Sequence, residues 1–348
     1  MKKRLVLTKA FGAAVLAGLA LFGCSSSSNP SPPAFPCTTP ATAPISPGPS
    51  DGPITSIKIE CQNTGNQDDL DASIPGTGIA LGGDGSGEHG YPQIYLPGVF
   101  NGRNPLQVPK NTRPLPTGTA IGPHGEHYAF YALVPYQDAN GKPNGYTSPD
   151  TVVVDLAHPE APLFTLHGIS QASGAYDAQT GRMVIVGNTQ DGHRALWQSA
   201  PVSQNAAWGS TLQQMGTFSG AMDGNRESQI VALPKGGFLV VGADSIPGQA
   251  LPLQAVTADT PQGLLTAKST VLVSPQTLPQ VYGPTITDIK EINGKEVVTL
   301  RVSTYGIVGP PGIHHYDPHT YTTTFAITRT NSGAAAQART PTIAPRIS

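Results

Sequence analysis

The segment LPKGGFLVVGAD, residues 233–244, decides the fold, because its pattern of strand, glycine turn and apolar strand occurs four times. The other copies are GPHGEHYAFYALVP at 122–135, DAQTGRMVIVGN at 177–188 and EINGKEVVTLRVS at 291–303. The turns are centred on glycines spaced 56, 56 and 57 residues apart: Gly125, Gly181, Gly237 and Gly294. A strand-only repeat of about 50 residues is typical of the blade of a β-propeller.

Each blade is expected to hold four antiparallel strands, the first innermost and the fourth outermost. The last copy has no outermost strand of its own, whereas loose strands are expected before the first copy at 56–60, 93–96 and 106–108. The sequence therefore predicts an all-β propeller, most simply of five blades, in which an N-terminal strand completes the last blade and leaves no open edge. Four or six blades are the alternatives.

The two ends of the chain differ in composition from the repeats. Residues 1–23 combine a basic start with a short apolar stretch that leads into Cys24, which resembles a bacterial lipoprotein signal; an ordinary cleaved signal peptide is the alternative. We expect a Ser/Pro-rich tether at 24–53, the propeller at 54–330 and a disordered tail at 331–348. The expected location is the extracytoplasmic face of a bacterial membrane, held only by the lipid on Cys24.

Composition narrows the expected partners. Charged residues are 12% of the 348, about half the usual share, and the formal net charge is −2, so nucleic acid is not a natural partner. With Cys24 assigned to lipid, Cys37 and Cys61 form an even pair, and we expect a disulfide, with two free thiols as the alternative. We expect a monomer with no cofactor and no metal, since no Cys–His spacing suggests zinc.

The catalytic candidates come from loops that a propeller gathers on one face around its channel. The loop at 220–227 places Asp223, Arg226 and Glu227 at the start of an innermost strand. Glycoside cleavage needs two carboxylates that flank the bond, so Glu227 is the candidate general acid. A salt-bridged loop that only orders the turn is the alternative.

The second catalytic carboxylate is expected in a glycine-rich segment at 76–90, where Asp84 is the candidate and a flexible loop is the alternative. Candidate substrate contacts, besides Asp223 and Arg226, are Asp191, His193, Tyr282, Tyr305, His314 and His315. The two tyrosines suit stacking on a sugar ring, although core packing is equally expected. The paired histidines are predicted sugar contacts, because adjacent ligands on a proline-flanked loop converge poorly on a metal ion.

Several stretches resemble glycosidase-type five-bladed propellers, among them ESQIVALPKGGFLVV at 227–241, VTADTPQGLL at 256–265 and RALWQSAPVSQNAAW at 194–208. The last copy, with YGPTI at 282–286, VTLRVSTY at 298–305 and TFAITR at 324–329, is similar to the final blade of one family of envelope domains from actinobacteria and their phages. That family, long of unknown function, includes endo-D-arabinanases. The similarity covers roughly residues 117–330 and is one of strands and turns.

The resemblance implies an envelope propeller that handles arabinan-type polysaccharide. If it is a glycosidase, the loop positions make Glu227 and an aspartate such as Asp84 the expected catalytic pair. The first two copies begin with TGTAIG and SQASGAY, which contain no acid, although glycosidase propellers usually place one there. The alternative is therefore a non-catalytic surface propeller that binds glycan or a protein partner, for which a contiguous apolar patch would be expected.

Overall fold

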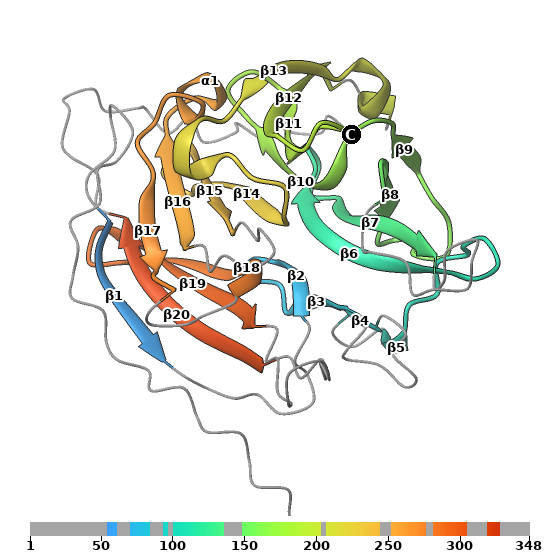
Figure 1. The fold of residues 1–348 in the computed structure, drawn as a ribbon, viewed down its shortest axis with the longest axis horizontal. Helices are drawn as coiled ribbons and strands as arrows, with labels where there is room; N and C mark the ends of the chain where they lie inside the picture. The colour runs from blue at the N-terminus through green and yellow to red at the C-terminus, as the bar shows by residue number, and fades with distance from the viewer. Residues whose placement is uncertain are drawn as a thin grey trace, which may run out of the picture. The chain divides into compact units, whose positions relative to one another are not determined.

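A computed structural model describes residues 54–60, 70–83, 93–96, 100–135, 148–202, 207–243, 252–275, 281–304 and 319–327. The described residues form five antiparallel sheets of four strands each, and each sheet is one blade of a β-propeller (Figure 1). The innermost strands of the blades contact one another in a closed cycle, β2–β6–β10–β14–β18–β2. The predicted fold class is therefore confirmed.

Four blades take their strands in sequence order, innermost first. Blade 1 consists of β2 (Leu70–Ile74), β3 (Ile79–Gly82), β4 (Gln93–Leu96) and β5 (Phe100–Arg103). Blade 2 consists of β6 (Thr112–Ile121), β7 (His127–Pro135), β8 (Thr151–Asp155) and β9 (Phe164–Leu166). Blade 3 consists of β10 (Ser170–Asp177), β11 (Arg182–Asn188), β12 (Arg194–Pro201) and β13 (Gln213–Thr217). Blade 4 consists of β14 (Ser228–Ala232), β15 (Phe238–Gly242), β16 (Leu253–Ala258) and β17 (Thr270–Val273).

Blade 5 joins the two ends of the propeller. It consists of β18 (Val281–Ile292), β19 (Lys295–Thr304), β20 (His319–Ile327) and the N-terminal strand β1 (Ile54–Glu60). Strand β1 pairs antiparallel with β20, and Ile54 lies opposite Ile327. Closure of the last blade by an N-terminal strand, as the sequence predicts, is confirmed.

The repeated motif forms the hairpin between the first and second strands of each blade. Its glycines have positive φ, for example 69° at Gly181 and 76° at Gly294, a conformation that costs a residue without a Cβ very little. The second strands of blades 2, 3 and 4 are buried along most of their length, because neighbouring blades cover both of their faces. The core therefore lies between the blades: Val184 of blade 3 and Val240 of blade 4 belong to one apolar cluster.

Side chains close the central channel partway along its length. The Gln229 Nε2 donates a hydrogen bond to the Ser73 carbonyl at 3.1 Å, which links blade 4 to the non-adjacent blade 1. The Thr119 hydroxyl donates to the same carbonyl at 2.6 Å. At Gly118 the strands are so close that an added Cβ would lie 2.2 Å from the Ser173 Cβ. A ligand therefore has room at the ends of the channel and not along it.

One expectation about blade 1 is wrong. Residues 106–108 form no strand, because the Leu106 N–H donates to the Asn104 side chain at 3.0 Å and not to a neighbouring strand. The first half of the glycine-rich segment forms a hairpin that the sequence did not predict: Gly76 and Gly78, with φ of 74° and 75°, form the turn between β2 and β3. Its second half, with Asp84, lies outside the described residues.

Candidate functional site

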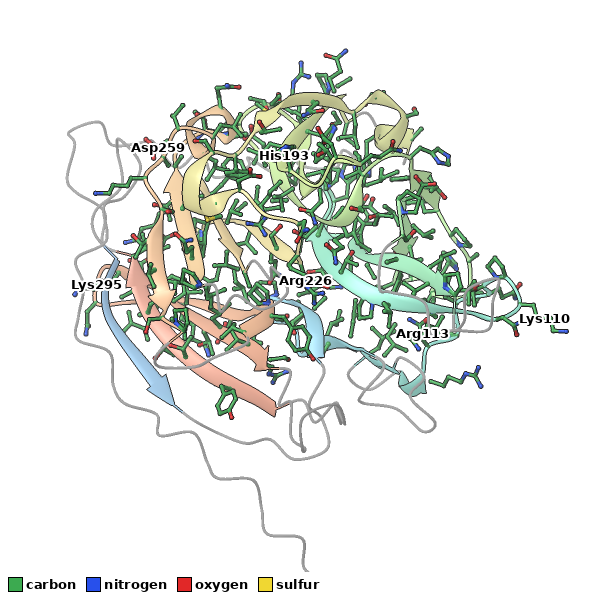
Figure 2. The ribbon with its side chains drawn as sticks, in the orientation of Figure 1. Lys110, Arg113, His193, Arg226, Asp259 and Lys295 are labelled. Atoms are coloured by element: carbon green, nitrogen blue, oxygen red, sulfur yellow. The ribbon has the colours of Figure 1, made fainter. Side chains whose placement is uncertain are left out.

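One face of the propeller gathers most of the predicted site residues. This mouth face is the end of the channel at which the innermost strands begin, and the opposite hairpin face carries the glycine turns. Five residues form a connected group on the mouth face, which we call the channel-mouth network: Gln171, Asn188, Arg226, Glu227 and Tyr282. Figure 2 shows Arg226 near the middle of the ring of blades, with His193 farther out over blade 3.

Glu227 uses both of its carboxylate oxygens within this network. Its Oε2 lies 3.0 Å from the Nε of Arg226, in an ion pair whose side chains are only 14% and 16% exposed. Its Oε1 accepts a hydrogen bond from the Gln171 Nε2 at 3.0 Å. A pair that is this shielded from water is held firmly, because removal of one partner leaves a buried charge uncompensated.

Gln171 is held in an unusual backbone conformation. Its φ is 49°, in the left-handed region that few residues other than glycine adopt. It lies where the register of β10 against β11 shifts between Ser170 and Ser173, and such bulges redirect side chains. Its Oε1 accepts from the Asn188 Nδ2 at 2.7 Å while its Nε2 donates to Glu227. The strained backbone thus places a buried amide between two partners, a feature often found at functional sites.

Gln171 is not among the residues predicted from the sequence, although the repeat contains a signal for it. Gln171 and Glu227 are 56 residues apart, which equals the repeat period. Residues one period apart occupy equivalent places on adjacent blades, so the innermost strands bring them side by side. The same holds for Ser173 and Ile230, which are 57 residues apart and joined by a 3.0 Å hydrogen bond.

Tyr282 supports Arg226 from below the mouth face. The Arg226 guanidinium carbon lies 5.6 Å from the centre of the Tyr282 ring, within the range of a cation–π contact. The tyrosine is 4% exposed. Its ring face is therefore not open to a sugar in this structure, and the core-packing alternative describes it better than the stacking role.

Arg194, at the start of β12, fixes the loop that carries Arg226. It is 1% exposed. Its Nη1 donates to the Met222 carbonyl at 2.7 Å, and its Nη2 donates to the carbonyls of Ala243 at 2.8 Å and Arg226 at 3.2 Å. At Gly242 an added Cβ would lie 2.7 Å from the Arg194 Nη1, so the glycine leaves space for the guanidinium. The sequence contains a signal for this role, a single arginine at the start of an apolar strand, but Arg194 is not among the predicted site residues.

His193 and Asp223, predicted from separate loops, meet on the mouth face. The His193 Nδ1 lies 2.9 Å from the Asp223 Oδ2, and the Asp223 Oδ1 accepts from the Arg194 N–H at 3.2 Å. The hydrogen bond that the Asp223 carboxylate accepts, together with its negative charge, raises the pKa of His193. Asp191 instead accepts a hydrogen bond from the Thr189 hydroxyl, which lowers the pKa of its carboxyl.

A pocket of about 450 Å³, which we call the mouth pocket, adjoins the channel-mouth network. Its walls are uncharged amides and hydroxyls from blades 2 and 3 and from the loop before β14, among them Ser148, Ser170, Gln171, Asn188, Gln190 and Asn225. Neutral groups that both donate and accept hydrogen bonds match a ligand that is itself rich in hydroxyls. Among the residues that the structure describes, none that lines the pocket has an ionisable side chain.

The other predicted site residues lie outside the described residues: Asp84, Tyr305, His314 and His315, and also Cys24, Cys37 and Cys61. A Glu227–Asp84 pair, the lipidation and the disulfide therefore stay predictions. In the described ranges, no group of three or more His, Cys, Asp or Glu residues could hold a metal ion. Within the same ranges, no helix is long and apolar enough to cross a membrane.

No protein-family profile and no curated protein matches the sequence. Solved structures with a similar arrangement include an exo-β-1,3-galactanase from Phanerochaete chrysosporium, at 9% identity over 80% of this chain and 59% of that chain, with a TM-score of 0.41. An α-L-arabinanase from Penicillium chrysogenum is 14% identical over 62% and 63%, with a TM-score of 0.34. A protein of unknown function from Dyadobacter fermentans is 12% identical over 68% and 64%, with a TM-score of 0.41.

This chain spans less than two thirds of the length of each of these three structures. Similarities this low transfer no activity, and the propeller architecture rests on the strand pairing and on the closed cycle of innermost strands. The resemblance to the actinobacterial and phage envelope family therefore stays a prediction.

Proposed function

We propose that the mouth face of this protein binds an envelope polysaccharide. The observation that carries the proposal is the pocket of amides and hydroxyls beside the shielded Arg226–Glu227 pair. Because the charges of Arg226 and Glu227 compensate each other, this pair and the described lining of the pocket offer hydrogen bonds without a net charge. A polyhydroxylated, uncharged chain is the ligand that such a surface fits.

Binding is better supported than hydrolysis. Hydrolysis requires an acid and a second carboxylate about 5–9.5 Å apart across the scissile bond. Glu227 is the one carboxylate of the channel-mouth network, and its oxygens are occupied by Arg226 and Gln171. Cleavage of an arabinan-type chain by Glu227 with Asp84 is the second candidate, favoured by the place of Glu227 at the start of an innermost strand.

We further propose that the protein is exported and held at the membrane through Cys24, with the mouth face directed away from the tether. Glu296, next to the hairpin turn of blade 5, pairs with Ile327, which in turn pairs with Ile54. The chain that precedes Ile54 therefore joins the propeller at the hairpin face.

The test uses the full chain in detergent, with arabinogalactan as the probe. We expect retention on the polysaccharide without release of oligosaccharides. The Glu227→Gln substitution should weaken retention about tenfold, or about 1.4 kcal/mol, because Arg226 loses its charged partner. A matched control is Glu291→Gln on the hairpin face, where Glu291 pairs with Lys235, and it should bind as the wild type does.

Each other outcome has a clear meaning. Release of oligosaccharides by the wild type, and not by the Glu227→Gln variant, would replace binding with hydrolysis and identify its acid. Equal weakening by the two substitutions would contradict the assignment of the ligand to the mouth face. If the wild type shows neither retention nor release, the proposal is wrong and a protein partner is favoured.

A further inference from the structure

A second pocket, which we call the seam pocket, lies at the seam between blades 2 and 3. It measures about 530 Å³ and lies between the outermost strand of blade 2 and the outer strands of blade 3. Its walls combine Phe164, Trp197 and Leu212 with the polar His167, Gln190 and Gln214. Its lining thus includes aromatic and leucine side chains, which are absent from the described lining of the mouth pocket.

The two pockets adjoin each other, because they share part of their lining. Thr189 and Gln190, in the loop between β11 and β12, line both of them. The mouth pocket begins at β10, the innermost strand of blade 3, and the seam pocket reaches Gln214 on β13, the outermost strand. Three strand spacings separate β10 from β13, or about 14 Å. We call the two pockets together the mouth-to-seam cleft. This cleft is longer than a single sugar ring needs.

The outer wall of the cleft is built into the fold. Phe164 packs edge-on against the buried Trp208, with ring centres 4.7 Å apart and planes at 87°. Trp208 belongs to the short 3₁₀ helix η2 (Ala207–Thr211), which contacts β9. At Gly209 an added Cβ would lie 2.3 Å from the Phe164 ring, so the absence of a side chain there lets the ring occupy this position. The wall is thus formed before any ligand arrives, which lowers the entropic cost of binding.

We propose that the mouth-to-seam cleft binds several consecutive units of a neutral polysaccharide, with one unit in the mouth pocket and the following units along the seam. This proposal rests on the proposed function and adds that the protein recognises a length of chain and not a single terminal sugar. The amides at the mouth orient one unit by hydrogen bonds. The apolar wall at Phe164 and Leu212 covers the carbon-bound faces of the next ones, which a monosaccharide in the mouth pocket would not reach.

The test compares two neighbouring residues of β13. Gln214 lines the seam pocket and pairs with Trp197, whereas Gln213, equally exposed, pairs with Gln198 and is not among the residues that line it. Gln214→Trp should fill the outer half of the cleft, and Gln213→Trp is the matched control. Tryptophan is well tolerated on exposed strands, and urea unfolding of both variants verifies that they fold.

The probes are a size-graded series of arabinan oligosaccharides from disaccharide to octasaccharide, with affinities measured by calorimetry on the full chain. For the wild type we expect the octasaccharide to bind at least about tenfold more tightly than the disaccharide. Gln214→Trp should remove that advantage and leave disaccharide binding within about twofold, while Gln213→Trp keeps it.

Equal wild-type affinity for disaccharide and octasaccharide would overturn the extended cleft and leave the proposed function standing. A length advantage that survives Gln214→Trp would place the additional units elsewhere and also overturn it. Binding of neither probe would count against the proposed function and with it the cleft.

Discussion

Replacement of Arg194 by methionine should destabilise the propeller and loosen the mouth face together. The buried guanidinium donates to three backbone carbonyls, those of Met222, Arg226 and Ala243. Methionine has a similar length and no donor, so Arg194→Met leaves these carbonyls buried without their present partner. Two of the three belong to the loop that carries Arg226 and Glu227 into the channel-mouth network.

The expected magnitude follows from two opposing effects. Hydrogen bonds that involve a charged group contribute about 1.5–3 kcal/mol each, so three contribute about 4–9 kcal/mol. Removal of the charge also removes its desolvation penalty, which is several kcal/mol for a buried ion. We therefore expect a net loss of about 2–4 kcal/mol in the free energy of unfolding, with the lost hydrogen bonds as the larger effect.

The assay is urea unfolding together with retention on arabinogalactan. The matched control is Arg182→Met in the same blade, because the Arg182 Nη1 donates to one carbonyl, that of Ser199, at 2.7 Å near the hairpin face. That control should cost about 1 kcal/mol and leave retention unchanged. Arg194→Lys, which keeps the charge and loses the planar fork, should fall between the wild type and Arg194→Met.

Two results would refute this reasoning. An Arg194→Met variant within about 0.5 kcal/mol of the wild type would mean that desolvation cancels the hydrogen bonds. A destabilised variant that nevertheless retains the polysaccharide as the wild type does would mean that Arg194 does not position the loop.

Two further predictions concern stability. Asp223 raises the pKa of His193, so protonation of His193 contributes stability that is fully present below its unfolded pKa of about 6.5 and is lost as pH rises through the raised folded pKa. The urea midpoint of the wild type should fall over this pH range, and that of Asp223→Asn should fall less. Parallel curves for the two proteins would contradict the pairing. Gly118→Ala should cost about 1–3 kcal/mol, because the new Cβ would lie 2.2 Å from the Ser173 Cβ and 2.7 Å from the Ala172 carbonyl. Thermal unfolding measures this loss, and an unchanged melting temperature would show that the innermost strands can separate at no cost.

Much of the fold could be predicted because its signals are local. The strand Gln93–Leu96 has the bounds that the sequence predicts, and the repeated motifs at 122–135 and 233–244 contain β7 and β15, since apolar runs and turn glycines lie within each blade. The first blade was harder to recognise. Its hairpin turn lies in a glycine-rich segment, which resembles a loop, and Leu106 is apolar and buried without belonging to a strand.

The candidate site could be predicted only in part. Loop positions on a propeller placed Asp223, Arg226 and Glu227 on the mouth face, and the structure brings His193 to Asp223. The hydrogen-bond partners of these carboxylates could not be predicted from the loop sequences, because some of the donors, such as Gln171, come from another blade. The burial of Tyr282 under Arg226 is likewise a property of packing.

The sequence by itself determined a strand-only repeat, its period, and the need for an N-terminal strand to close the ring, because these follow from local hydrophobic patterns and turn residues. Only the tertiary structure decided that Gln171 adopts a left-handed backbone and holds Glu227. It also decided that the two pockets adjoin each other at Thr189 and Gln190. The physical reason is that hydrogen bonds between blades join residues a whole repeat apart, and their geometry is set when the innermost strands close into a ring.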